Sequence, residues 1–328
     1  MNNRKNARKI FQQYVLSAAL FGLITSLGAV PAFCADMDVY GPLPKPMKVR
    51  NVNANKEIPV SEFENFYKSA ADGDSVGLNS LLQCHVTPVD GGGNLGELTA
   101  LDWVALNGNE SFVENLLNYD PTVIEQTGSL GSPAIHFAAL RGHTKVMEVL
   151  LKKKDALANS IGYGSTVLSV AVMTNNQEGA ELLLRKGAKI DLADGNGLTP
   201  LHHATAGRDA SMINFLLERG ANANAEGCHR GIKFTALHIS VDFNCPDIAE
   251  MLLTHGALVD TIIMGGGTDL HYALHRNHTG VAKVLVQHGA NVNLLDSKGL
   301  TPLQIAENRN NAEMIEILVQ HGAMARQQ

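Results

Sequence analysis

One short string recurs along this chain at a nearly constant interval. Thr199-Pro200-Leu201-His202 has full or degenerate copies whose aliphatic anchors are Leu101, Ile135, Leu168, Leu201, Leu237, Leu270 and Leu303. The steps between these anchors are 34, 33, 33, 36, 33 and 33 residues. A second series of apolar pairs keeps the same intervals, from Leu116-Leu117 to Leu318-Val319. Two series with a common period of about 33 residues indicate a solenoid of stacked units rather than one globular core.

The residues of each repeat also predict local structure. Threonine before proline suits a helix start, because its hydroxyl can accept from an exposed backbone N–H and proline already has the φ of the first turn. Glycine after the apolar pair can take the left-handed conformation that ends a helix. It is followed by alanine at Gly187, Gly220, Gly256, Gly289 and Gly322. Polar turns such as 194–197 come next and favour hairpin tips.

Over about residues 97–323 the string, the period and the closing glycines together resemble the ankyrin repeat. The resemblance implies an all-α repeat solenoid, in which helix-turn-helix units stack and carry short β-hairpin fingers. Seven repeats are expected over 97–328. In this family the histidine of the motif forms a structural hydrogen bond near the helix start.

Some segments depart from the regular repeat. The first two repeats lack a closing glycine and have Asp120-Pro121 and Lys154-Asp155 near that position, so we expect them to be less regular. The step of 36 residues puts an insertion near Cys228 and predicts one lengthened finger. Residues 60–96 are expected to form an N-terminal capping unit and degenerate repeat, because Phe63, Phe66, Tyr67 and Ala70 share one helix face.

Residues 1–35 have the order of a secretory signal peptide, which is a basic start, an apolar run and small residues before Asp36. An uncleaved membrane anchor is the alternative, although the apolar run is short for a span of about 20 residues. Residues 36–59 are proline-rich and are expected to be an extended linker. The mature part is therefore predicted to be exported, either to a periplasm or to the medium.

The charge of the chain limits its partners. The formal net charge is −6, and removal of residues 1–35, which hold four basic and no acidic residues, leaves −10. An acidic solenoid without a basic stripe argues against nucleic acid, because phosphate binding needs lysine or arginine. We therefore expect a basic or neutral protein partner, no stable membrane span after cleavage of the signal, and a monomer.

Cysteine and histidine offer no strong case for a cofactor. Cys228 and Cys245 would lie at opposite ends of a helix, so a disulfide between them requires the inserted loop to fold back. His271, His275 and His278 share a helix face, which suggests zinc, but the repeat already explains His271 and His278. Neither a nucleophile motif nor a phosphate-binding loop is present in the sequence. We expect no catalytic residue, metal or cofactor.

The ankyrin resemblance implies that proteins bind at a concave surface built from the fingers and the exposed ends of the inner helices. By register, the candidate contact residues are Arg141, Tyr163, Met173, Asp242, Phe243, Met264, His275, Arg276, Asn308 and Arg309. For Phe243, the sequence favours a partner contact and packing under the inserted loop equally. The leading hypothesis is a non-enzymatic exported scaffold. The alternatives are an envelope or periplasmic regulator or protector of an enzyme, and a secreted effector that binds host proteins.

Overall fold

The computed structural model describes residues 45–89, 97–129, 131–229, 232–262 and 266–324. The chain divides into two compact units, Met1–Asn196 and Gly197–Gln328, which we call unit 1 and unit 2. The signal peptide predicted for residues 1–35 lies outside the described residues. Within them, none of the helices is both long and apolar enough to span a membrane.

Unit 1 begins with a small antiparallel sheet in the order β2-β1-β3. Its strands are β1 (Lys45–Asn51), β2 (Lys56–Ile58) and β3 (Cys84–Val89). The predicted linker over 36–59 therefore needs correction, because its second part is paired in this sheet. Val49 of β1 lies opposite Val86 of β3, and both side chains are fully buried. Proline-rich sequence favours extended backbone, and these apolar residues give that backbone a partner.

The helix expected from the face of Phe63 and Tyr67 is α3 (Val60–Ala71), and α4 (Ser75–Leu82) follows it. Aromatic side chains pack α3 against the repeats of the same unit. The ring of Phe63 lies 6.4 Å from that of Trp103, and the ring of Tyr67 lies 4.8 Å from that of Phe112, both edge to face. Such contacts add to the burial of apolar surface.

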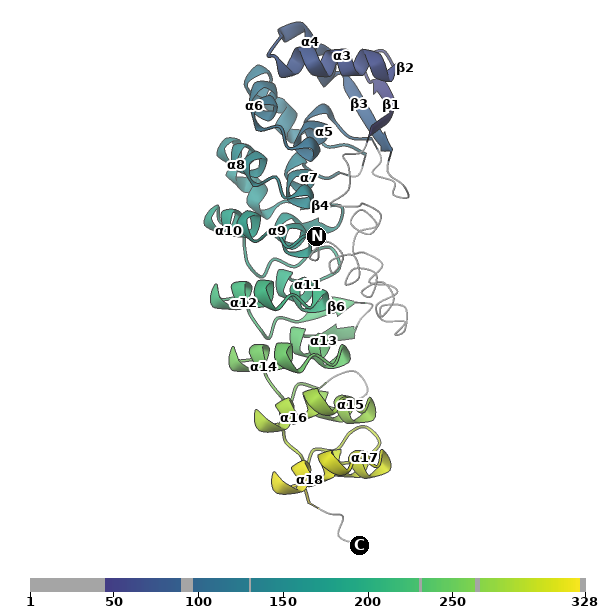
Figure 1. The fold of residues 1–328 in the computed structure, drawn as a ribbon, viewed down its shortest axis with the longest axis vertical. Helices are drawn as coiled ribbons and strands as arrows, with labels where there is room; N and C mark the ends of the chain where they lie inside the picture. Colours follow the sequence, from purple (N-terminus) through teal and green to yellow (C-terminus); the bar gives the residue numbers. More distant parts are fainter. Residues whose placement is uncertain (1–44, 90–96, 130, 230–231, 263–265, 325–328) are drawn as a thin grey trace. The chain divides into compact units, whose positions relative to one another are not determined.

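The repeats of unit 1 form two rows of helices (Figure 1). The inner row contains α5 (Ala100–Asn107), α7 (Ala134–Arg141) and α9 (Val167–Met173). The outer row contains α6 (Glu110–Tyr119), α8 (Thr144–Lys153) and α10 (Gln177–Arg185). A hairpin of β4 (Ile161–Gly162) and β5 (Ser165–Thr166) precedes α9. The predicted irregularity of the first two repeats is confirmed, since short 3-10 helices, η1 (Pro121–Glu125) and η2 (Asp155–Asn159), follow their outer helices.

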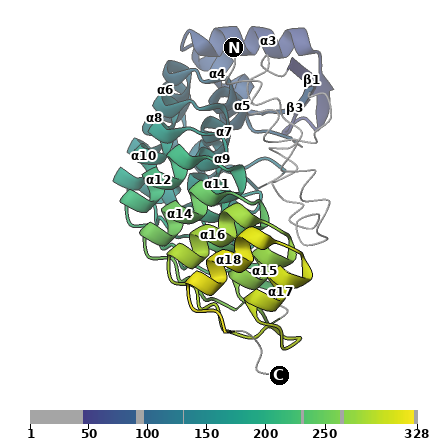
Figure 2. The same ribbon diagram turned by 60° about the horizontal axis from the view of Figure 1, so that its bottom comes forward.

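Unit 2 repeats the same arrangement more regularly (Figure 2). Its inner helices are α11 (Pro200–Gly207), α13 (Ala236–Asp242), α15 (Asp269–His275) and α17 (Pro302–Asn308). Its outer helices are α12 (Ala210–Glu218), α14 (Pro246–Thr254), α16 (Thr279–Gln287) and α18 (Ala312–Gln320). The predicted long finger is a hairpin of β6 (Gly227–His229) and β7 (Ile232–Phe234).

The recurring string acts as a helix cap in unit 2. The Nδ1 atom of His271 accepts from the backbone N–H of Thr268 at 3.1 Å, and His238 and Thr235 form the same pair at 2.9 Å. At the other end of each repeat, the glycine before alanine has a left-handed φ, 83° at Gly289 and 85° at Gly256. These caps hold every inner helix in the same register, so equivalent residues recur at equivalent places.

Candidate protein-binding face

The C-terminal ends of the inner helices in unit 2 carry large polar and aromatic side chains. The residues that cap α11, α13, α15 and α17 are, in that order, Arg208, Phe243, Arg276 and Arg309. The turn that follows is the same in the last three repeats, because asparagine takes a left-handed φ at Asn244, Asn277 and Asn310. Asparagine tolerates this conformation better than most residues. The repeated turn therefore presents Phe243, Arg276 and Arg309 at one edge of the inner row, whereas Arg208 stands one position later in its own repeat, where those repeats have asparagine.

A small polar network surrounds Asp242 at the end of α13. The hydroxyl of Tyr272 donates to Oδ1 of Asp242 at 2.6 Å, and Nη2 of Arg276 lies 3.9 Å from the same oxygen. The guanidinium of Arg276 also lies 5.8 Å from the centre of the Tyr272 ring. Burial, with the hydrogen bond to Asp242 as the second cause, raises the pKa of Tyr272 above its usual range. Two predicted contact residues, Asp242 and Arg276, are thus brought together here.

Phe243 is half-buried, and the guanidinium of Arg208 lies 5.4 Å from the centre of its ring. A cation over an aromatic face is a favourable contact of about 0.5–1 kcal/mol where it is exposed. Arg208 was not among the predicted contact residues. The sequence does mark Arg208, because it stands at a position of the repeat where the other repeats have glycine or asparagine.

His275, a third predicted residue, reaches from α15 to the loop before α17. Its Nε2 lies 3.2 Å from Oδ2 of Asp296. Desolvation acts to raise the pKa of Asp296, but hydrogen bonds from the backbone N–H groups of Leu300 and Lys298 and from His275 outweigh it and lower that pKa. Asn308 and Arg309 are exposed at the end of α17. Met264 lies outside the described residues.

The remaining predicted residues belong to unit 1. Arg141 ends α7, Met173 ends α9, and both are half-buried. Tyr163 lies in the turn between β4 and β5 with a φ of 50°, a conformation that is uncommon for a tyrosine. The structure places Arg141 on one repeat of unit 1 and both Tyr163 and Met173 on the next.

The histidines that suggested zinc have structural partners. His271 caps Thr268 through Nδ1, and its Nε2 lies 3.0 Å from the carbonyl oxygen of Leu294. Nδ1 of His278 lies 2.9 Å from the carbonyl oxygen of Val241. Over the described ranges, no group of three metal-ligating side chains could hold an ion. Cys228 and Cys245 are both free thiols.

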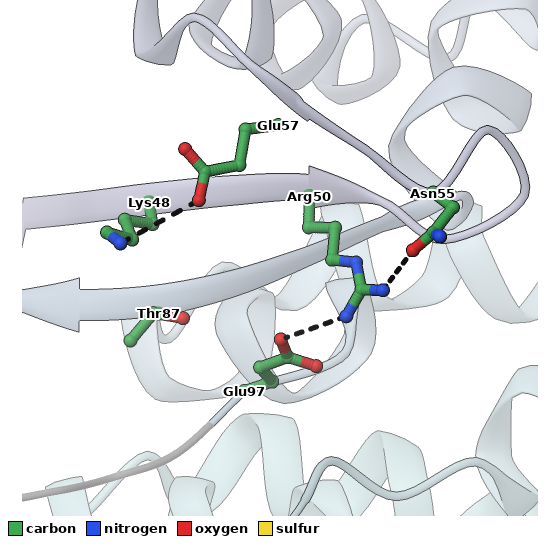
Figure 3. Close-up of a pocket in the computed structure, with 6 residues that line it drawn as sticks. All are labelled: Lys48, Arg50, Asn55, Glu57, Thr87 and Glu97. Atoms are coloured by element: carbon green, nitrogen blue, oxygen red, sulfur yellow. Dashed lines mark hydrogen bonds and ion pairs between the residues drawn. The ribbon is translucent and has the colours of Figure 1, made fainter.

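The sheet of unit 1 carries a polar pocket of about 320 Å³, which the sequence did not suggest. Figure 3 shows its lining residues, Lys48, Arg50, Asn55, Glu57, Thr87 and Glu97. The charges are balanced within it, because Lys48 lies 3.7 Å from Glu57 and Arg50 lies 3.8 Å from Glu97. Arg50 also donates to the amide oxygen of Asn55. The pocket therefore has no net charge to attract a ligand.

Comparison with known proteins identifies the repeat. A family model described as "Ankyrin repeats (3 copies)" matches residues 101–194, 188–263 and 257–328. The chain belongs to the ankyrin repeat family. Two ankyrin structures are similar to it. The ankyrin repeat domain of Bcl-3, "a unique member of the IkappaB protein family", is 25% identical with a TM-score of 0.61, over 67% of this chain and 97% of that one.

The human ASB11 ankyrin repeat domain is 23% identical with a TM-score of 0.55, over 69% of this chain and 99% of that one. This likeness shows the fold alone. No curated protein matches the chain significantly. Ankyrin repeats are generally protein–protein interaction modules and typically non-enzymatic, so the family directs attention to the inner-helix ends as a contact face.

Proposed function

We propose that this ankyrin-repeat chain is a non-enzymatic, exported scaffold that binds a partner protein through its inner-helix ends and fingers. The observation that carries the proposal is the contrast within each repeat of unit 2. The helix faces are filled by buried aliphatic residues such as Leu270 and Leu303, whereas the helix ends bear Phe243, Arg276 and Arg309. Aromatic residues and arginine are enriched at protein interfaces.

Export rests on the order of residues 1–35 in the sequence. Two destinations are compatible with that segment. In an envelope or periplasm the scaffold would regulate or protect an enzyme, and in the medium it would act as an effector on host proteins. The destination decides which partner is available, so both are tested together.

The test is affinity capture with the full chain carrying a C-terminal tag, from envelope extract and separately from culture supernatant or host lysate. The wild type is compared with Phe243→Ala/Arg276→Ala. We expect a partner that the wild type captures and the variant loses. The extract that supplies it identifies the destination. Equal capture by both proteins would place the binding face elsewhere.

Stability is the necessary control. Arg276 and Asp242 form a partly exposed pair at 3.9 Å, and such pairs contribute about 0–1 kcal/mol. We therefore expect the double variant to keep its melting temperature within about a degree or two, given that about 1 kcal/mol shifts Tm by a few degrees. Lys145→Ala, exposed on the outer helix α8, is the matched control for the loss of one surface charge.

A further inference from the structure

Four consecutive inner helices of unit 2 end in a row of side chains, Arg208, Phe243, Arg276 and Arg309, which we call the arginine row. Each of these helices packs against the next, α11 on α13, α13 on α15 and α15 on α17, and the views in Figures 1 and 2 show them side by side. The three arginines are separated by 68 and 33 positions in the chain. They form no basic run in the sequence, so the net charge, from which we expected a basic or neutral partner, does not describe this edge of unit 2.

Two contacts orient the middle of the row. Arg208 extends from α11 over the Phe243 ring, and Arg276 turns back from α15 toward Asp242. Both guanidinium groups thus approach the end of α13 from opposite sides. Asp242 also accepts from the Tyr272 hydroxyl, so Tyr272 and Arg276 share its Oδ1. Arg276 is 41% exposed, so an incoming carboxylate can reach it.

The backbone at Arg208 is a second observation. Its φ is 54°, in the left-handed region, at a position where other repeats have glycine or asparagine. Arginine there costs about 1 kcal/mol relative to glycine, because its Cβ crowds the backbone. Local backbone strain of this kind clusters at functional sites. The residue that bears the strain is the one whose guanidinium extends the row to a fourth helix.

The spacing of the row matches an extended peptide. Neighbouring packed helices lie about 8–10 Å apart. An extended chain advances about 3.3–3.6 Å per residue, so about three residues span one repeat. In such a peptide, two carboxylates three residues apart would meet Arg276 and Arg309. A third carboxylate, six peptide residues from the one at Arg276, would meet Arg208. An apolar peptide residue halfway between those two would lie at Phe243. Arginine can bind a carboxylate through two parallel hydrogen bonds.

We propose that the partner of this face presents an extended acidic segment, with the pattern acid-x-x-apolar-x-x-acid-x-x-acid read in either direction. This inference rests on the proposed scaffold function and specifies its partner. A protein segment fits better than nucleic acid. Nucleic acid carries a charge at every nucleotide, whereas the three arginines stand a repeat or more apart, and the chain as a whole carries −6. Spaced carboxylates can instead meet the arginines alone.

The test is fluorescence anisotropy with labelled peptides and the full chain. One peptide carries the pattern on Gly/Ser spacers, one carries it in reverse order, and a third has the same composition with the acids adjacent. We expect one of the patterned peptides to bind at least about fivefold more tightly than the third, with affinity that falls as salt rises. Equal binding of all three, or no binding, would overturn the proposed pattern.

Variants locate the binding. Arg276→Gln and Arg309→Gln should each weaken the patterned peptide by about three- to tenfold, and Arg276→Lys/Arg309→Lys should recover part of the loss, since lysine keeps the charge without the fork. Lys145→Gln, exposed on the outer helix α8, removes the same charge away from both the row and the fingers and should change binding less than twofold. An equal loss with Lys145→Gln, or tighter binding of a single-stranded oligonucleotide than of the patterned peptide, would contradict an acidic protein segment.

The two proposals fail separately. If a partner captured by the wild type is also captured by Arg276→Gln/Arg309→Gln, the scaffold function stands and the acidic segment is wrong. If peptides bind the row as expected but no protein is captured from any extract, the site stands and the scaffold function is wrong.

Discussion

Units 1 and 2 build the same pair of helix rows but end their repeats differently. In unit 2 a glycine with a left-handed φ closes each repeat, and an asparagine of one repeat ties it to the next, as Asn293 does by donating to the carbonyl oxygen of Gly322 at 3.0 Å. In the first repeats of unit 1 the chain instead leaves the outer helix in an extended conformation, at Asp120 and Lys154, and enters a 3-10 helix. The shared period of apolar residues, rather than one type of helix end, is therefore what makes the stack.

The units also differ in how they use a buried carboxylate. Asp102, in unit 1, accepts from the backbone N–H of Thr99 at 2.9 Å and from that of Gly128 at 3.2 Å, and burial raises its pKa to about 7. Asp269, in unit 2, occupies the first helical position, where two other repeats have proline. Burial raises its pKa to about 8, and its Oδ2 lies 3.9 Å from Nε2 of His238. Neither of these two atoms has a hydrogen-bond partner among the described residues.

The largest expected effect tests whether the apolar period acts equally in both units. Leu150 of α8 and Leu285 of α16 are fully buried at equivalent positions. Leu150→Ala and Leu285→Ala should each lower the free energy of unfolding by about 2–5 kcal/mol, because each leaves a cavity. Denaturant unfolding measures this, with the half-exposed Val319→Ala as a control of small effect. A cost below about 1 kcal/mol in one unit only would show that the two units do not share this basis of stability.

The second prediction separates the two buried carboxylates by the sign of their effect. At pH 8, Asp269→Pro should raise the free energy of unfolding by roughly 2–4 kcal/mol, because it removes a buried acid whose Oδ2 lacks a hydrogen bond and restores a residue suited to the first helical turn. Asp102→Ala should lower it by about 1–3 kcal/mol, because two backbone donors lose their acceptor. The same sign for both, by chemical denaturation, would contradict this difference between the units.

A third prediction follows from the pKa of Asp269. An aspartate in the unfolded chain titrates near pH 4, whereas the folded chain keeps the Asp269 proton up to about pH 8. Between these values only the folded chain binds the proton, so its stability falls as the pH rises. Burial lowers the pKa of the neighbouring His238 to about 4. Between about pH 4 and pH 6.5 only the unfolded chain therefore binds the proton of this histidine, so His238 lowers the stability as the pH falls. Both Asp269→Pro and wild type retain His238.

The advantage of Asp269→Pro over wild type should therefore grow from near zero at pH 4 to roughly 2–4 kcal/mol at pH 8. Unfolding curves at four or five pH values across that interval would measure it. A difference independent of pH would assign the gain to proline alone and not to the buried carboxyl.

The smallest expected effect concerns the helix ends. Gly289 has a φ of 83°, and a Cβ there would meet nothing within 4 Å, so Gly289→Ala should cost about 1–2 kcal/mol through its backbone alone. Gly289→Asn should cost less, since asparagine tolerates this region. In unit 1 the equivalent helix end at Lys154 has an extended backbone, which alanine adopts without strain. Lys154→Ala should therefore lower the free energy of unfolding by less than about 1 kcal/mol, which is the contribution of the exposed ion pair with Glu125. Equal costs for Gly289→Ala and Lys154→Ala would remove the distinction between the two kinds of end.

Much of the fold was predictable because its signals are local and periodic. The anchors predicted the repeats, the aromatic face of Phe63 and Tyr67 predicted α3, and the 36-residue step predicted the hairpin of β6 and β7. The family model and the similar structures confirm the ankyrin fold. The small sheet was missed because Val49 and Val86 pair across 37 positions, a separation that leaves no local signal in the sequence.

The candidate site was predictable only residue by residue. Register placed Asp242, Phe243, His275 and Arg276 at the ends of inner helices. It could not reveal that Arg276 turns toward Asp242, that Tyr272 shares that carboxylate, or that Arg208 joins Phe243. Each of these contacts crosses from one repeat to the next, where side-chain length and direction decide the outcome.

By itself, the sequence determined the repeat, its period, its helix caps and the positions that must be buried, because hydrophobic periodicity and backbone preferences act over a few residues. Tertiary structure alone decided which distant side chains meet. Stacking brings Arg208, Arg276 and Arg309 together from three of the four inner helices of unit 2, and it leaves Asp269 buried beside His238. Electrostatics depends on distance in space and on burial, and neither quantity can be read along the chain.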